Sequence, residues 1–297
     1  MPSVIIIGAG IAGIASALRL RSLGLEVAVF ESNPYPGGKL HAFELSGYRF
    51  DAGPSLFTMP ELVTELFELF DIDSKDYFTY SRKETLCNYF WEDGKRFIMR
   101  ANIEESTMEA AELFGVEQSK LIKYLNKSKK KFELTSPLFL EKSLHKIGTY
   151  LSMDTLKALA NLPILDLSST LNAVNEKNIM EPHLVQLFNR YATYNGSSPY
   201  KTPGIMSMIP HLEMGLGTYF PKGGMHSITK SLFKLAEDQG VRFYFNSRIE
   251  EIIIENKKQL VFERQRVIKL QILLSPIWMS IQPIVNYAPS CLHLKKY

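Results

Sequence analysis

The sequence predicts an α/β fold with three layers and a mostly parallel sheet, into which a mainly helical domain is inserted. Three observations lead to this prediction. Residues 1–80 begin with a strand, a glycine-rich turn, a helix and a second strand. Residues 81–200 lose this rhythm and show helical periodicity instead. Residues 201–258 resume the first pattern, so we expect the chain to leave the first domain and return to it.

The N-terminal segment predicts a βαβ unit. The apolar run Val4–Ile7 is typical of a buried strand, and the Ala- and Leu-rich stretch over about residues 11–23 is typical of a helix. Gly24 ends that helix, and a second apolar strand follows at Val27–Phe30. Glycines interrupt the first apolar stretch, so we expect neither a signal peptide nor a membrane-spanning helix here.

The turn after the first strand has the spacing of a dinucleotide-binding loop. Gly8 permits a tight turn, Gly10 lets the backbone approach a pyrophosphate, and Gly13 lets the helix pack on the strand. The helix then begins with Ile11 and Ala12, whose free N–H groups and positive dipole end favour phosphate. These five residues are therefore predicted to bind a cofactor.

Glu31 closes the second strand, 18 residues beyond Gly13. An acidic side chain at this position can accept both hydroxyls of an adenosine ribose, and it disfavours the 2′-phosphate of NADP. The flanking strand, helix, strand and acid together predict dinucleotide binding, and they leave the identity of the dinucleotide open.

The next segment narrows the choice of dinucleotide. Gly37, Gly38 and Lys39 follow the ribose-binding acid, and a strand-like stretch then leads to Gly53 and Pro54. A plain hairpin turn is the alternative explanation of the two glycines. At this point the sequence resembles the flavin-dependent amine oxidase and phytoene desaturase superfamily, whose members place such a segment along the FAD diphosphate. The resemblance implies FAD as the cofactor, a Rossmann-like FAD-binding fold, and these five residues as further contacts.

Three longer phrases, residues 37–70, 189–213 and 217–252, resemble carotenoid desaturases of the bacterial phytoene desaturase type. Within that group, "YATYNGSSPYKTPG" is most similar to the enzymes that act on hydroxylated carotenoid ends, the 3,4-desaturases. The resemblance implies an FAD-dependent oxidoreductase that introduces C=C bonds into a long apolar carotenoid during carotenoid biosynthesis. It also implies a cytoplasmic protein, peripheral on the inner face of the cell membrane.

The central insert, by this resemblance, caps the flavin and builds a tunnel for the substrate. Residues 136–153 mix apolar side chains with lysines, so they fit either a membrane interface or an amphipathic helix that faces the core. The lysine run over residues 127–131 fits either a solvated helix face or contact with anionic lipid headgroups. The formal net charge of +3 is too small to indicate nucleic acid as a partner.

The returning segment contains a tight turn, a helix through about residue 236 and a strand predicted at Val241–Phe245. The resemblance implies that the turn, with Pro221, Gly223 and Gly224, faces the flavin and the substrate. His226 lies two residues after Gly224, and it is either a packed histidine or a group that faces the cofactor. The resemblance also implies that the backbone of Ile249 contacts the adenine.

The sequence contains no HExxH, CxxC, GxSxG or Walker P-loop motif, and its histidines are too scattered to predict a metal site. We therefore assign no catalytic residue and no metal. This fits the expected chemistry, because dehydrogenation of a polyene by a flavin asks the protein for orientation, exclusion of water and an apolar channel. Two further interpretations stay open: a flavin-binding remnant that does not turn over, and an amine oxidase-like flavoprotein.

Residues 259–297 are expected to be an out-of-frame tail, so that the C-terminal part of the fold is missing. Read from the third base of each codon, the codons of Ser275–Tyr287 are compatible with "SNMDVNPTYRKL", a phrase typical of the resembling family. A genuine divergent C-terminus is the alternative. If the frame is shifted, no residue after about Lys258 has a selected role, and that includes Trp278 and Cys291.

Overall fold

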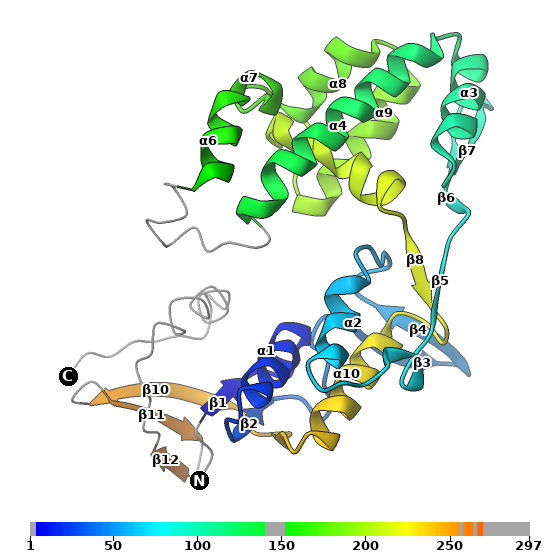
Figure 1. The fold of residues 1–297 in the computed structure, drawn as a ribbon. Coiled ribbons are helices and arrows are strands. Elements are labelled where there is room, and N and C mark those ends of the chain that lie inside the picture. The colour runs from blue at the N-terminus through cyan, green and yellow to red at the C-terminus, as the bar shows by residue number, and fades with distance from the viewer. Residues whose placement is uncertain (1–3, 140–151, 256–257, 264–265, 270–297) are drawn as a thin grey trace. The chain divides into compact units, whose positions relative to one another are not determined.

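Two units make up the chain in the computed structural model, which describes residues 4–139, 152–255, 258–263 and 266–269 (Figure 1). The first unit is formed by residues 1–81 and 219–297, and the second by residues 82–218. The chain thus leaves the first unit once and returns to it once. The return comes at Tyr219, later than the predicted boundary at residue 200.

A parallel sheet lies at the centre of the first unit, in the order β1-β2-β9. Its strands are β1 (Val4–Ile7), β2 (Val27–Phe30) and β9 (Arg242–Tyr244). Val4 pairs with Val27, and Ala28 pairs with Arg242, so β2 has a parallel neighbour on each side. All four residues of β2 are buried, as is usual for a parallel strand covered on both faces. The predicted α/β fold is confirmed.

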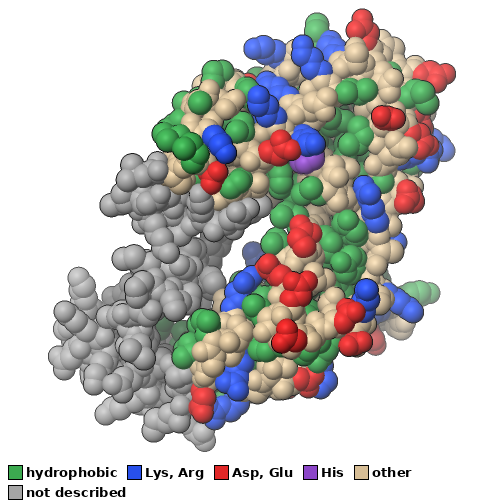
Figure 2. Space-filling model, in the orientation of Figure 1, with side chains coloured by type: hydrophobic (Ala, Val, Ile, Leu, Met, Phe, Trp, Pro, Cys, Tyr) green, Lys and Arg blue, Asp and Glu red, His purple; other side chains and the backbone are tan. Residues whose placement is uncertain are grey.

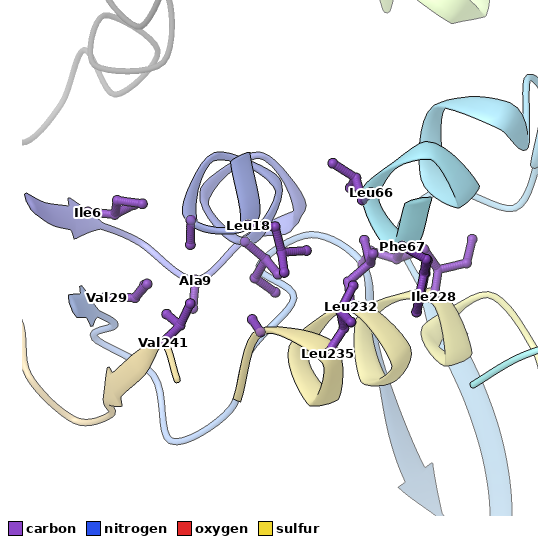
Figure 3. Packing of buried hydrophobic residues seen from close by; sticks show 14 of the residues in the cluster. Ile6, Ala9, Leu18, Val29, Leu66, Phe67, Ile228, Leu232, Leu235 and Val241 are labelled. Carbon is purple, nitrogen blue, oxygen red and sulfur yellow. The ribbon is translucent and has the colours of Figure 1, made fainter. Parts of the chain in front are cut away.

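Three helices of the first unit share one apolar core (Figure 3). They are α1 (Ile11–Ser22), α2 (Glu61–Glu68) and α10 (His226–Asp238). Their side chains Leu18, Phe67, Leu232 and Leu235 are fully buried in it. Each such side chain contributes about 1.5–3 kcal/mol relative to an exposed one, so packing is a large part of what holds the returning helix α10 to the N-terminal segment.

Short strands and one short helix complete the first unit. Hairpin β3 (His41–Leu45) and β4 (Tyr48–Ala52) turns at Ser46 and Gly47, both with positive φ, which is the backbone that a two-residue hairpin loop requires. The remaining elements are η1 (Ser74–Asp76), β5 (Tyr80–Arg82) where the chain leaves the first unit, β8 (Tyr219–Pro221) where it returns, and the antiparallel strands β10 (Ile249–Glu255), β11 (Lys258–Glu263) and β12 (Arg266–Lys269).

The second unit is mainly helical, but it begins with a hairpin that the periodicity did not predict. The hairpin strands are β6 (Thr85–Phe90) and β7 (Arg96–Arg100). The helices are α3 (Ile103–Phe114), α4 (Gln118–Phe139), α6 (Met153–Ala160), α7 (Leu162–Leu165), α8 (Leu171–Ile179) and α9 (Pro182–Asn189), with the shorter η2 (Arg190–Asn195), η3 (Gly204–Met208) and the π-helical η4 (His211–Gly215).

Local signals set the helix ends in the second unit. The Asn102 side chain accepts the backbone N–H groups of Glu104 and Glu105 and so caps α3. Gly115 ends the same helix in the left-handed conformation, with φ +67°. Gly115 therefore separates α3 from α4, although residues 81–200 show helical periodicity throughout this part of the sequence.

The core of the second unit contains a small apolar cavity of about 20 Å³, room for roughly one water molecule. It is lined by Phe97, Met99, Ser106, Thr107, Ala110, Leu121, Leu125, Leu184, Phe188 and Met214. A cavity of this size does not accommodate a polyene.

The lysine run is not a uniformly solvated face, and that interpretation is wrong for Lys131. This side chain is fully buried, and its Nζ donates to Asp166 Oδ2 at 2.6 Å and to Ser207 Oγ at 2.5 Å. Lys127 pairs with the same carboxylate at 2.8 Å. Burial lowers the pKa of Lys131, against the effect of Asp166. The lysine thus ties α4 to η3 within the unit.

Part of the sequence prediction concerns residues outside the described ranges. Most of the segment 136–153 and all of residues 270–297, with Trp278 and Cys291, belong there. Within the described ranges, every helix is too short or too polar to cross a bilayer. On the face that Figure 2 shows, acidic and basic side chains are interspersed, in keeping with the small net charge.

Candidate nucleotide-binding site

The turn between β1 and α1 has the conformation that its glycines permit. Gly8 adopts φ +96°, and its N–H donates to the carbonyl of Phe30 at 2.7 Å. Gly10 is the N-cap of α1, with φ −69° and ψ 171°. A Cβ atom added at Gly8 or Gly10 would meet nothing within 4 Å. The backbone of this turn is therefore open to a ligand.

Gly13 is constrained in a different way. A Cβ atom there would lie 2.0 Å from the carbonyl oxygen of Gly8 and 3.5 Å from Ile6 Cγ2. No side chain fits at that distance, so the third glycine of the motif serves the packing of α1 against the turn.

The N-terminus of α1 offers N–H groups that have no acceptor among the described residues. The first intrahelical bond runs from Ile14 N–H to the carbonyl of Gly10 at 3.0 Å, which leaves Ile11, Ala12 and Gly13 without intrahelical acceptors. No side chain caps this end, and its first turn contains no acidic residue. These three N–H groups and the helix dipole can hold an anion such as a diphosphate.

Glu31 is 5% exposed, and its carboxylate is fixed by hydrogen bonds. Oε2 accepts the N–H of Ala9 at 2.7 Å, and Oε1 accepts the N–H of Asn33 at 2.9 Å. A carboxylate has about four acceptor positions, so Oε2, which accepts one donor among the described residues, retains capacity for a hydroxyl. The acid is held beside the α1 turn, as a ribose-binding group must be.

The second glycine segment lies directly against the α1 turn. Gly37 and Gly10 form a parallel bridge, and Gly37 N–H donates to the carbonyl of Ala9 at 2.7 Å. A Cβ atom on Gly38 would lie 3.3 Å from the Cα of Gly10. Gly37 and Gly38 have positive φ values of +113° and +58°. The structure thus brings together two glycine motifs that are 27 residues apart in the chain.

Gly53 packs closely on the same segment, because its missing side chain would meet the carbonyl oxygen of Lys39 at 1.8 Å. Lys39 itself and Pro54 are exposed next to this contact. Their side chains are accessible, and no hydrogen bond of theirs to the α1 turn is present among the described residues.

Asp51 is a residue of this region that the sequence interpretation missed as a functional group. Its carboxylate accepts the N–H of Met225 at 2.8 Å and the N–H of His226 at 3.1 Å, and it pairs with Arg49 at 2.6 Å. It therefore caps α10, directly after the turn with Gly224. The sequence contains only one signal of this role. The phrase "PKGGMH" before α10 contains no capping side chain, so another segment must supply the acceptor for the first N–H groups of the helix.

His226 begins α10, and its ring has an unsatisfied atom. Nε2 is buried and has no hydrogen-bond partner within the described part of the chain. Burial lowers the pKa of this imidazole, and nearby Lys230 and Arg49 lower it further. These effects favour the neutral form of the ring, and a bound group could satisfy Nε2.

Pro221 and Ile249 belong to strands outside the two glycine motifs. Pro221 is buried in β8, and Gly223 precedes the α10 cap with φ +85°. Ile249 begins β10, and the segment that leads into it is fixed near the acid, since Ser247 N–H donates to the carbonyl of Glu31 at 2.8 Å. No hydrogen bond within the described ranges links Ile249 itself to the candidate site. Within those ranges, too, no group of three His, Cys, Asp or Glu side chains could hold a metal ion.

Comparison with known proteins adds a family match. Residues 11–269 match the model of the family described as flavin containing amine oxidoreductase. The chain is 57% identical over 258 residues, 87% of its length, to the 1-hydroxycarotenoid 3,4-desaturase of Flavobacterium sp. strain P99-3, and it covers 52% of that protein. It is 31% identical over 252 residues, 84% of its length, to the 4,4′-diaponeurosporene oxygenase of Staphylococcus aureus strain RF122, and it covers 50% of that protein.

Among solved structures, the fold is similar to that of an oxidoreductase from Methanosarcina mazei, with a TM-score of 0.59 and 17% identity. The similarity covers 89% of this chain and 56% of the other. The chain therefore spans about half the length of the curated relatives and of the solved structure that it matches.

Proposed function

This chain belongs to the family of flavin containing amine oxidoreductases, and from that membership we propose that it functions as an FAD-dependent carotenoid desaturase. The observation that supports the proposal most strongly is the 57% identity over 87% of the chain to a protein named 1-hydroxycarotenoid 3,4-desaturase. The proposed substrate is accordingly a long apolar polyene with a hydroxylated end, and the proposed reaction forms a C=C bond in it.

The residues of the first unit fit FAD. The free N–H groups of Ile11, Ala12 and Gly13 suit the diphosphate, and the open face of Gly10 lets it approach. The Glu31 carboxylate retains an acceptor for the ribose. Further contacts are proposed from Gly8, Gly37, Gly38, Lys39, Gly53, Pro54 and the Ile249 backbone, with Pro221, Gly223, Gly224 and His226 toward the flavin and substrate.

When bound, the flavin supplies the acceptor for the hydride that leaves the polyene, whose second hydrogen leaves as a proton. The protein's own residues bind and orient the cofactor through the α1 turn and the second glycine segment. A neutral His226, with Nε2 unsatisfied, can donate or accept one hydrogen bond there, depending on its tautomer. No described residue is assigned as the base.

We extend the proposal to a peripheral position on the inner face of the cell membrane, where an apolar polyene dissolves. Helix α6 supports it, because Met153, Leu156 and Leu159 are 65%, 53% and 52% exposed and follow one another at three-residue intervals. Exposed apolar side chains gathered in this way are typical of a contact surface.

Flavin binding and turnover can be tested separately. The purified chain is incubated with FAD, free cofactor is removed, and visible flavin absorption is measured. A stoichiometric amount of a 1-hydroxycarotenoid is then added without another electron acceptor. The expected result is loss of the oxidised flavin band together with a red shift of the polyene spectrum, because the conjugated system becomes longer.

The other outcomes identify the alternatives. Bound flavin that no carotenoid reduces would support a flavin-binding protein without turnover. Flavin reduced by an amine would support an amine oxidase-like activity. An oxygen-dependent product carrying a new oxygen at the polyene end would point to the second relative, which is named an oxygenase.

Gly10→Ala is expected to weaken FAD binding at least about tenfold, the equivalent of roughly 1.4 kcal/mol, while the chain stays folded. The added methyl group meets no protein atom within 4 Å, so it occupies the space left for the ligand. The φ of −69° also suits alanine. A titration followed by flavin fluorescence measures the dissociation constant, and the thermal midpoint without FAD serves as the control. Equal affinity in the two proteins would argue against a diphosphate at this turn.

A further inference from the structure

Asp51 lies at the junction of two segments that are far apart in the chain. It belongs to β4, and its two oxygens accept the consecutive N–H groups of Met225 and His226, 174 and 175 residues later. These are among the first N–H groups of α10, a helix of 13 residues, and they have no intrahelical acceptors. One carboxylate thus satisfies two donors at the positive end of a helix dipole.

The surroundings of the Asp51 carboxylate favour its ionised form and hold its orientation. Burial opposes ionisation, but the hydrogen bonds from Met225 and His226 and the neighbouring Arg49 together lower the pKa of Asp51 below its usual value. Arg49 and Asp51 are two residues apart on one strand and therefore project from the same face of the hairpin. That face contacts α10, whereas the opposite face carries Phe43 and Phe50, whose rings stack at 5.4 Å.

The fit around Asp51 leaves no space for a side chain at the turn. A Cβ atom on Gly224 would lie 2.3 Å from Asp51 Oδ2 and 2.6 Å from an Arg49 nitrogen, and Gly224 has φ +89°. The glycine turn, which by the family resemblance faces the flavin, therefore packs directly against the Asp51 carboxylate. A negative charge here also makes the α10 N-terminus a poor phosphate site, in contrast to the uncapped α1.

Helix α10 connects Asp51 with the nucleotide-binding turns. The Thr229 hydroxyl, one turn into the helix, donates to the carbonyl of Leu40 at 2.7 Å. The Thr229 methyl group would lie 2.8 Å from a Cβ atom on Gly37. Gly37 in turn donates to Ala9 in the α1 turn. A continuous series of contacts therefore runs from Asp51 through α10 to the loop beside Gly10.

We propose that Asp51 is a positioning residue of the nucleotide site, which holds α10 and its glycine turn in place so that the Gly37–Gly38 segment lies against the α1 turn. The role assigned to the site rests on the proposed FAD-dependent function. In this role Asp51 acts on the site through α10.

Asp51→Asn tests this proposal, with Glu44→Gln as the matched control. Glu44 lies opposite Arg49 on the same face of the hairpin, is exposed, and makes no hydrogen bond to α10 among the described residues, so its change removes a negative charge from this face without removing an acceptor from the helix. Two quantities are measured in both variants and in the unchanged chain: amide hydrogen exchange at Met225 and His226, and the affinity and visible spectrum of bound FAD. The first needs no cofactor, so it remains informative if the chain takes up none.

The expected result for Asp51→Asn is exchange about tenfold faster at one of these amides or at both, because the asparagine side chain has an NH₂ donor in place of one of the two carboxylate oxygens and its remaining oxygen carries no charge. We also expect FAD affinity several-fold weaker, with a changed flavin spectrum, and wild-type behaviour in Glu44→Gln. Unchanged exchange would overturn the role of Asp51 in holding α10. Faster exchange with unchanged affinity and spectrum would overturn its role at the site. A wild-type chain that binds no FAD would overturn the proposed function, while the exchange rates would still decide the first point.

Discussion

Gly13→Ala is expected to destabilise the first unit by about 3 kcal/mol or more, a large fraction of the roughly 5–15 kcal/mol that stabilises an ordinary domain. The new Cβ atom would lie 2.0 Å from the carbonyl oxygen of Gly8 and 3.2 Å from its carbonyl carbon. Both are backbone atoms of a turn fixed by a hydrogen bond to Phe30, so neither can move by rotating a side chain. Urea unfolding followed by circular dichroism measures the change.

Gly10→Ala is the matched control, because it makes the same chemical change three residues earlier in the same motif. Its methyl group meets no atom within 4 Å, so the free energy of unfolding should stay within about 0.5 kcal/mol of the original. The two variants thus separate the packing at Gly13 from the ligand access proposed for Gly10. A Gly13→Ala chain as stable as the original would contradict the geometry of the α1 turn.

Glu213→Leu is expected to cost the second unit about 3 kcal/mol, the low end for a broken buried pair, because it leaves the partly buried guanidinium of Arg190, 27% exposed, without a counter-charge. The Glu213 carboxylate is 3% exposed. It accepts from Arg190 at 2.7 Å and from the hydroxyl of Tyr194 at 2.7 Å. The Arg190 Nε donates to Tyr89 at 3.0 Å, so the cation is tied to a hairpin as well as to the π-helical segment. Thermal or urea unfolding gives the measurement.

The double variant Arg190→Met/Glu213→Leu distinguishes the lost pair from lost packing. Removing both charges leaves no unpaired ion in the core, so the double variant should recover a large part of the stability that the single variant loses. Equal stability of the single and double variants would show that the charge on Arg190 is not the cause.

The βαβ unit could be predicted because its determinants are local. Strands β1 and β2 have the bounds that their apolar runs indicate, Val4–Ile7 and Val27–Phe30, and α1 begins at Ile11 directly after its glycine turn. Each of these features depends on residues that are neighbours in the chain. The steric requirement at Gly13 follows from the same local geometry.

The rest depends on residues that meet only after folding. Asp51 finds its two donors 174 and 175 residues away, and no local pattern identifies them. Lys131 looks like part of a solvated run because its neighbours are lysines, but Asp166 and Ser207 approach it from later segments. The sequence shows a glycine between α3 and α4. The left-handed conformation of Gly115, which ends α3, is a property of the folded chain.

The split of the first unit between the two ends of the chain has a consequence for the order of events during synthesis. Strand β2 can pair with β1 as soon as residue 30 has been made, but its other neighbour, β9, and the helix α10 come after residue 225. The continuous segment 82–218 is complete before either of them. A growing chain can therefore fold its helical insert first, while β2 and the apolar side of α1 await their partners and depend on chaperones or speed to escape aggregation.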